Sequence, residues 1–127
     1  MTLFSAEYNV GATVDMDDQL QSFSVCNGEY FNNELSLAGL NGDLNGGHYF
    51  VSMIDISATW CGPCQDYASG PMSVVTDEWE NHPNVKIITS LSDLNQPYSC
   101  AQWGNLGSSS EDPLIVHDPS YKFMGWF

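Results

Sequence analysis

Trp60-Cys61-Gly62-Pro63-Cys64 is the stretch that decides both the fold and the chemistry of this 127-residue chain. Two cysteines at this spacing, at the start of a helix, form a reversible dithiol–disulfide couple. Unpaired N–H groups and the helix dipole favour a thiolate at a helix N-terminus, so Cys61 is the better placed thiol. Cys64 lies one turn further along and is placed to resolve a mixed disulfide on Cys61. Gly62 and Pro63 suit the tight start of the helix, where the missing N–H of proline has no intrahelical partner.

The CxxC spacing alone also occurs in zinc ribbons, haem-attachment sites and structural disulfides. Gln65 follows the second cysteine, where c-type haem attachment needs a histidine. A four-cysteine zinc site usually pairs one CxxC with another, whereas Cys26 and Cys100 stand alone and far apart. A zinc- or copper(I)-binding module and a non-catalytic scaffold therefore stay as alternative functions.

The residues around the motif predict a buried strand and a kinked helix. Residues 49–57 are an apolar-rich run of strand length, typical of a central strand. After the motif, Met72, Val75 and Trp79 recur at helical spacing and predict a core-facing stripe. Pro71 should kink this helix because it lacks a backbone N–H. Further along, residues 85–91 predict the next strand and residues 99–104 a short helix.

These features resemble the thioredoxin superfamily. The resemblance is carried by Asp55-Ile56-Ser57-Ala58-Thr59-Trp60-Cys61-Gly62-Pro63-Cys64 and the strands on either side, and it covers about residues 48–126. It implies an α/β fold with a central mixed sheet flanked by helices. Residues 23–29 and 35–40 resemble the N-terminal hairpin of the extended redoxins, with Asn27-Gly28 as the turn.

The resemblance also implies roles for individual residues. Cys61 is implied as the nucleophile and Cys64 as the buried resolving thiol. Asp55 occupies the position of the family's buried aspartate, which implies that it accepts the proton of Cys64. Burial in an apolar strand raises the pKa of a carboxyl and suits it to general-base work. The alternative is an aspartate turned to solvent.

A proline after the last predicted helix matches the family's loop in which a cis-proline faces the disulfide. This resemblance implies a cis bond at Asp112-Pro113 and a docking groove shaped by Pro113. Residues 114–117 would form the fourth strand and residues 121–126 an antiparallel fifth. Asp112 departs from the apolar residue or threonine usual there, and a carboxylate near Cys61 would disfavour its thiolate. The predicted substrate contacts are Trp60, Gly62, Pro63 and Asp112.

A peroxiredoxin-like thiol peroxidase is the main alternative enzyme. That family activates its cysteine with an arginine and with a threonine three residues earlier, where this chain has Ala58. The chain contains no arginine, and its only basic residues besides histidine are Lys86 and Lys122. A peroxidase without that cation would hold its thiolate poorly, so disulfide exchange with protein substrates is the preferred function.

Composition restricts the partners. A formal net charge of -14, from 16 acidic and two basic residues, argues against binding nucleic acid or an anionic membrane. No stretch approaches the ~20 apolar residues of a membrane span, and no residues indicate a cofactor or a metal site. We expect one domain over residues 1–127, divided into an acidic arm (1–20), a hairpin and loop (21–47) and a thioredoxin core (48–127).

Two further expectations concern the remaining cysteines and the end of the chain. Cys26 and Cys100 could form a structural disulfide, stay as two buried thiols, or exchange with Cys61. A structural disulfide implies an oxidising compartment, which favours a periplasmic or extracytoplasmic location over the cytoplasm. The covering C-terminal helix of thioredoxins is missing after Phe127. We therefore expect the N-terminal arm to cover the open sheet face, or a homodimer formed through that face or the C-terminal strand.

Overall fold

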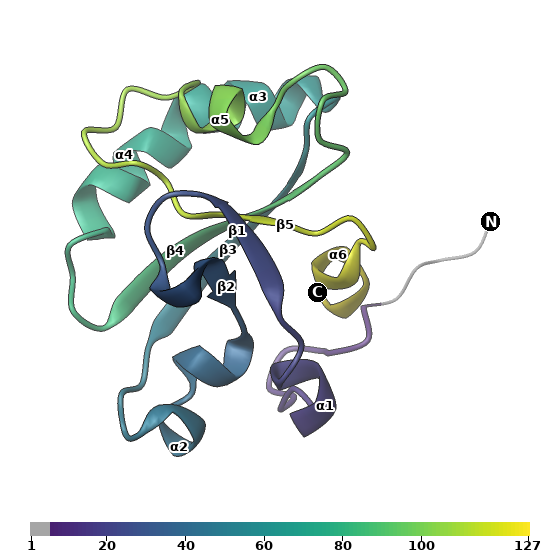
Figure 1. Ribbon diagram of the computed structural model, residues 1–127, viewed down its shortest axis with the longest axis vertical. Helices are drawn as coiled ribbons and strands as arrows, with labels where there is room; N and C mark the ends of the chain where they lie inside the picture. The colour runs from purple at the N-terminus through teal and green to yellow at the C-terminus, as the bar shows by residue number, and fades with distance from the viewer. Residues whose placement is uncertain (1–5) are drawn as a thin grey trace.

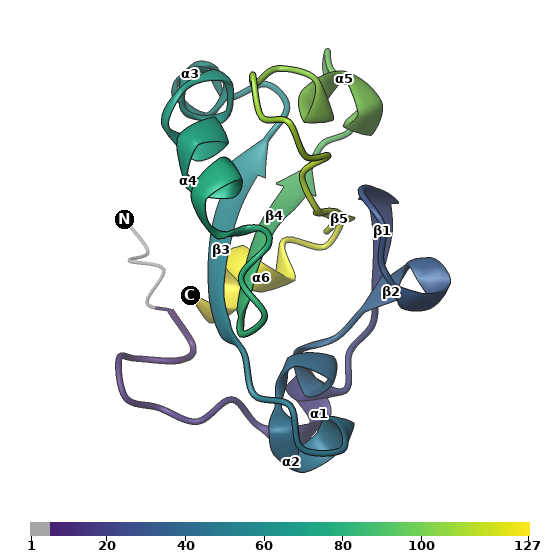
Figure 2. The same cartoon turned by 90° about the vertical axis from the view of Figure 1, so that its left-hand side faces the viewer.

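The computed structural model describes residues 6–127 as a mixed α/β fold. A five-stranded sheet in the order β2-β1-β5-β4-β3 runs through it, and helices flank the sheet (Figure 1, Figure 2). The strands are β1 (Phe23–Asn27), β2 (Glu34–Leu35), β3 (Val51–Ala58), β4 (Val85–Ser92) and β5 (Ile115–His117). The helices are α1 (Met16–Gln19), α2 (Gly42–Asn45), α3 (Gly62–Ser69), α4 (Pro71–Trp79), α5 (Cys100–Gly104), α6 (Lys122–Trp126) and the 3-10 turns η1 (Phe31–Asn33) and η2 (Leu37–Leu40).

The parallel pair β3 and β4 forms the part of the sheet that leads to the CxxC motif. Their register runs from Val51 opposite Val85 to Ala58 opposite Ser92, and β4 in turn pairs in parallel with β5. The strands predicted at 49–57 and 85–91 are both present, with bounds shifted by two residues or fewer. Because β3 stands at the end of the strand order, the CxxC motif follows an edge strand, and the prediction of a buried central strand over residues 49–57 is wrong.

The predicted N-terminal hairpin is present, but its turn is wider than Asn27-Gly28 alone would make it. β1 pairs antiparallel with β2, and residues 28–33 connect the two strands. Gly28 has a φ of +79°, and a Cβ there would lie 2.9 Å from the carbonyl oxygen of Pro113. The side chain of Asn27 donates to the same oxygen at 2.8 Å. This close approach requires glycine and fixes the hairpin to the segment before β5.

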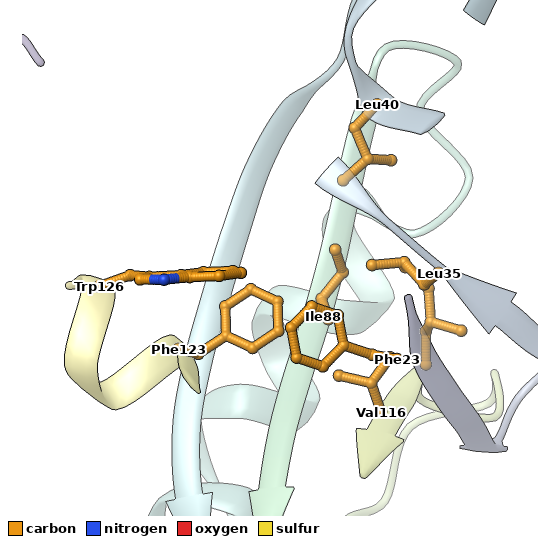
Figure 3. Packing of buried hydrophobic residues seen from close by; sticks show 8 residues of the cluster. Phe23, Leu35, Leu40, Ile88, Val116, Phe123 and Trp126 are labelled. Carbon is orange, nitrogen blue, oxygen red and sulfur yellow. The ribbon is translucent and has the colours of Figure 1, made fainter. Parts of the chain in front are cut away.

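One face of the sheet carries the larger hydrophobic cluster, shown in Figure 3. Its buried members are Phe23, Leu35, Leu40, Ile88, Leu114, Val116, Phe123 and Trp126. Phe123 and Trp126 belong to α6, so the prediction of a strand over residues 121–126 is wrong. Their spacing of three places both rings on one side of a helix, where they pack on Phe23.

The N-terminal arm lies along α6 on this face. The backbone N–H groups of Glu7 and Tyr8 donate to the carbonyls of Gly125 and Trp126 at 3.0 and 2.9 Å. The Tyr8 ring packs against the hydrophobic cluster. The expectation that a covering C-terminal helix is missing is therefore wrong, because α6 lies on this face and the arm joins it there through Tyr8. The first five residues of the arm lie outside the described part of the chain.

The other face of the sheet is covered by α3, α4 and α5. A second cluster lies there, built on Leu91, Cys100, Trp103 and Ile115. The predicted kink is confirmed as a full break, since α3 ends at Ser69 and α4 begins at Pro71.

Asp118 fixes the start of α6. Its side chain is only 2% exposed, and its two oxygens accept from the backbone N–H groups of Lys122 and Phe123, both at 2.9 Å. Ser90 donates to the same carboxyl at 3.4 Å. These bonds satisfy two of the N–H groups that a helix leaves unpaired in its first turn, so Asp118 holds α6 and the preceding Tyr121 in place.

We expect Asp118→Ala to lower the free energy of unfolding by about 2 kcal/mol, because buried N–H groups lose a charged acceptor. Asp118→Asn keeps one acceptor oxygen and should lose less. Urea unfolding followed by tryptophan fluorescence measures both variants. If both variants lose the same free energy of unfolding, the Asp118 side chain does not stabilise the protein through its hydrogen bonds to α6.

Candidate redox site

The two cysteines of the motif are joined in a disulfide at the N-terminus of α3. Their Cα atoms lie 5.2 Å apart, and Cys61 is the N-cap residue of the helix. The backbone N–H of Cys64 points at the Cys61 sulfur, 3.3 Å away. A thiolate on Cys61 would therefore receive a backbone N–H and the positive end of the helix dipole. The same arrangement favours the leaving of Cys61 when its bond is broken.

The two sulfurs differ in their surroundings. Cys64 packs against the cluster of Leu91, Cys100, Trp103 and Ile115. Both cysteines are half-buried, whereas Gly62 and Pro63 between them are exposed. The exposed first residues of α3 leave Cys61 accessible from the side of residues 60–63, while Cys64 packs toward the protein interior.

An aspartate that the sequence did not single out anchors Trp60. The indole N–H of Trp60 donates to the Asp93 carboxylate at 2.6 Å, and the Tyr121 hydroxyl donates to it at 2.5 Å. The buried Thr59 hydroxyl donates to the Asp93 backbone carbonyl. The bonds from Tyr121 and Trp60 lower the pKa of Asp93 below its ordinary value. The only signal in the sequence was an aspartate two positions after the strand predicted at residues 85–91.

Asp55 lies in β3 on the sheet face that α3 and α4 cover. Its neighbours Ile54 and Ile56 pack against the cluster on the opposite face, and strand alternation turns Asp55 the other way. Burial raises the pKa of Asp55, although the Ser57 hydroxyl, which donates to it at 3.0 Å, opposes the shift. A half-buried carboxyl that holds its proton more firmly than usual is suited to proton transfer.

The raised pKa of Asp55 gives a stability prediction. The folded state binds the proton more tightly than the unfolded state, so stability falls as the pH rises from the ordinary carboxyl value of about 3.9 through the raised one. Asp55→Asn should therefore raise the free energy of unfolding at pH 7, and the gain should disappear below pH ~3.9. Urea unfolding across that range tests this. Asp66→Asn, at an exposed aspartate on α3, is the matched control. The same gain in both variants would contradict burial as the cause.

The peptide bond between Asp112 and Pro113 differs from what the resemblance implied. The cis peptide bond within residues 6–127 is Gln96-Pro97, so the expectation of a cis bond at Asp112-Pro113 is wrong. Pro113 lines a small cavity together with Ala68, one helical turn after Cys64, and Asp112 is exposed. The segment bonded to Trp60 is instead the start of the loop after β4, at Asp93.

Cys26 and Cys100 form a second disulfide, with Cα atoms 6.1 Å apart and 74 positions between them in sequence. The bond ties the end of β1 to the start of α5. Of the three arrangements left open by the sequence, the structure has the structural disulfide. Cys26 and Cys64 pack against the same cluster, so both disulfides lie on the same side of the sheet.

No group of three or more His, Cys, Asp or Glu side chains within residues 6–127 is arranged to hold a metal ion. None of the helices described for these residues combines the length and apolar character that crossing a bilayer requires.

Comparison with known proteins gave no match among protein-family models, curated proteins or solved structures.

Proposed function

We propose that this chain is a thioredoxin-like thiol–disulfide oxidoreductase that exchanges disulfides with protein substrates through Cys61 and Cys64. One observation carries the proposal. The two half-buried cysteines are bonded to each other at the N-terminus of an eight-residue helix, with Cys61 as the N-cap. This geometry stabilises one thiolate and keeps the second sulfur within bonding distance.

In the reducing direction the exchange has two steps. The Cys61 thiolate attacks one sulfur of the substrate disulfide, which forms a mixed disulfide and releases the other substrate sulfur as a thiolate. The Cys64 thiolate then attacks the Cys61 sulfur, which closes the Cys61–Cys64 disulfide and releases the second substrate sulfur. Two electrons pass to the substrate, and a dithiol reductant returns the couple to its thiols.

The surrounding residues supply the remaining roles. Asp55 is proposed to accept the proton of Cys64, supported by its burial and its raised pKa. Trp60 and the exposed residues Gly62 and Pro63 are proposed to contact the substrate. The second disulfide supports an oxidising compartment as the site of action.

The proposal is tested on the intact wild-type chain. Its reduction potential is measured against glutathione, and its catalysis of insulin reduction by dithiothreitol is measured beside a peroxide-consumption assay. We expect insulin reduction and no peroxide consumption. A Cys61–Cys64 couple that stays inert to dithiol reductants, or zinc or copper retained in stoichiometric amount, would overturn the proposal.

A further inference from the structure

The Asp93 carboxylate is bonded to Trp60, the residue directly before Cys61, and its side-chain hydrogen-bond donors are neutral. These donors are the indole of Trp60 and the hydroxyl of Tyr121. Neither stabilises the carboxylate by neutralising it, so the charge stays available to a third group. The ammonium group of Lys86 is placed against other residues: within the described part of the chain it lies over the rings of Tyr30 and Phe50, at 6.0 and 5.8 Å from their centres.

Two aromatic side chains frame this carboxylate, and both are open to solvent. Trp60 is 62% exposed and Tyr121 is 42% exposed. In residues 6–127 neither ring is paired with another aromatic ring. Both rings bind Asp93 through their polar edge atoms, which leaves their faces without a hydrogen-bonding role. A carboxylate between exposed aromatic rings matches the chemistry that recognises organic cations.

The position of this group relates it to the exchange reaction. Trp60 immediately precedes Cys61, and the backbone at Asp93 is held to the same segment by Thr59. A polypeptide whose sulfur reaches Cys61 from the exposed side must pass close to Trp60. A side chain near the substrate cysteine is therefore within reach of Asp93.

We propose that Asp93, framed by Trp60 and Tyr121, selects protein substrates that carry a lysine or arginine close to the cysteine attacked by Cys61. The inference rests on the proposed disulfide exchange and adds the class of substrate. The formal net charge of -14 acts in the same direction, because acidic substrates are repelled by the whole chain. Selection by Asp93 can be distinguished from attraction by the net charge. Only selection by Asp93 depends on that carboxylate more than on any other.

The test uses peptides joined by a disulfide, identical except for one position two residues from the cysteine, which holds Lys, Arg, Gln or Glu. The pre-reduced protein is mixed with each peptide, and the second-order rate constant of thiol release is measured. We expect the Lys and Arg peptides to react about fivefold faster than the Gln peptide, from one exposed charge pair and one cation–π contact. The Glu peptide should be the slowest.

Two matched variants locate the preference. Asp93→Asn should bring the Lys-to-Gln rate ratio close to one, whereas Asp66→Asn, which removes an equal charge from the exposed face of α3, should preserve it. Equal rates for Lys, Gln and Glu peptides in the wild-type protein would overturn the inference without any variant. An equal loss of preference in both variants would also overturn it, since the global charge would then suffice.

Failure of the inference and failure of the proposed function give different results. Reduction of all peptides at the same rate contradicts selection by Asp93 and supports disulfide exchange. Reduction of none of them contradicts the exchange itself and the inference with it.

Discussion

Cys61→Ser should lower the rate of insulin reduction by at least about a thousandfold, because the variant lacks the sulfur that attacks the substrate. Cys64→Ser should fail in a different way. Its Cys61 still attacks, but the mixed disulfide has no internal thiol to resolve it. The expected product is a covalent adduct with the substrate, visible as a shifted band on a non-reducing gel and lost on reduction.

The double variant Cys26→Ala/Cys100→Ala is the control for these two substitutions. It also loses a disulfide, but it keeps the couple at the N-terminus of α3. At temperatures where it is folded, it should reduce insulin at a rate close to that of the wild-type protein. Sustained insulin turnover by Cys64→Ser without a trapped adduct would contradict the two-step exchange. Peroxide consumption that survives in Cys64→Ser would instead indicate a peroxidase.

The second large effect concerns stability. Removing the disulfide between Cys26 and Cys100 should lower the free energy of unfolding by roughly 4 kcal/mol, because the bond closes a long loop in the unfolded chain. The two residues are 74 positions apart, and the loop contains β3, α3, α4 and β4. Urea unfolding of Cys26→Ala/Cys100→Ala against the wild-type protein measures the loss.

Cys61→Ala/Cys64→Ala is the matched control for this loss. It removes a disulfide between residues only three positions apart, for which the same chain-entropy estimate gives roughly 2 kcal/mol. The expected result is a clearly smaller loss than for the long-loop pair. Equal losses for the two pairs would show that the length of the closed loop does not set their contributions.

The elements next to the CxxC motif could be predicted because local signals agree there. The apolar run before Trp60 forms β3, the run at residues 85–91 forms β4, and Pro71 starts a new helix. Ser99, at the start of the predicted short helix, accepts from the backbone N–H of Gln102, while the Gln102 side chain accepts from the N–H of Ser99. Each of these features follows from residues within one or two helical turns of each other.

The segment after Pro113 was predicted less well because its structure depends on distant residues. Residues 121–126 are short enough that their pattern suits a strand or a helix. The choice of α6 follows from Asp118, which binds its first N–H groups, and from Phe123 and Trp126, which pack on Phe23 about a hundred positions earlier. The structure therefore has strands where the thioredoxin resemblance implied them at β3 and β4, but β3 is an edge strand, and the chain departs from the resemblance again after Pro113.

The same limit applies to the site. Cys61, Cys64 and Trp60 are adjacent in sequence and could be identified together. Asp93 lies 33 positions after Trp60, and Tyr121 lies 28 positions after Asp93, and nothing in their local sequence indicates these contacts. The resemblance implies a buried Asp55, and in the structure strand alternation within β3 turns this residue toward the face that α3 and α4 cover.

The bond between Cys26 and Cys100 also determines how the molecule carries mechanical load. When the chain is pulled by its two ends, tension passes from Cys26 directly to Cys100, and residues 27–99 are bypassed. β3, α3, α4 and β4, with the redox couple among them, then bear no force, while β5 and α6 lie in the loaded path. Stretching an oxidised molecule therefore strips Tyr121 away from Asp93 before it can extend the helix that holds Cys61.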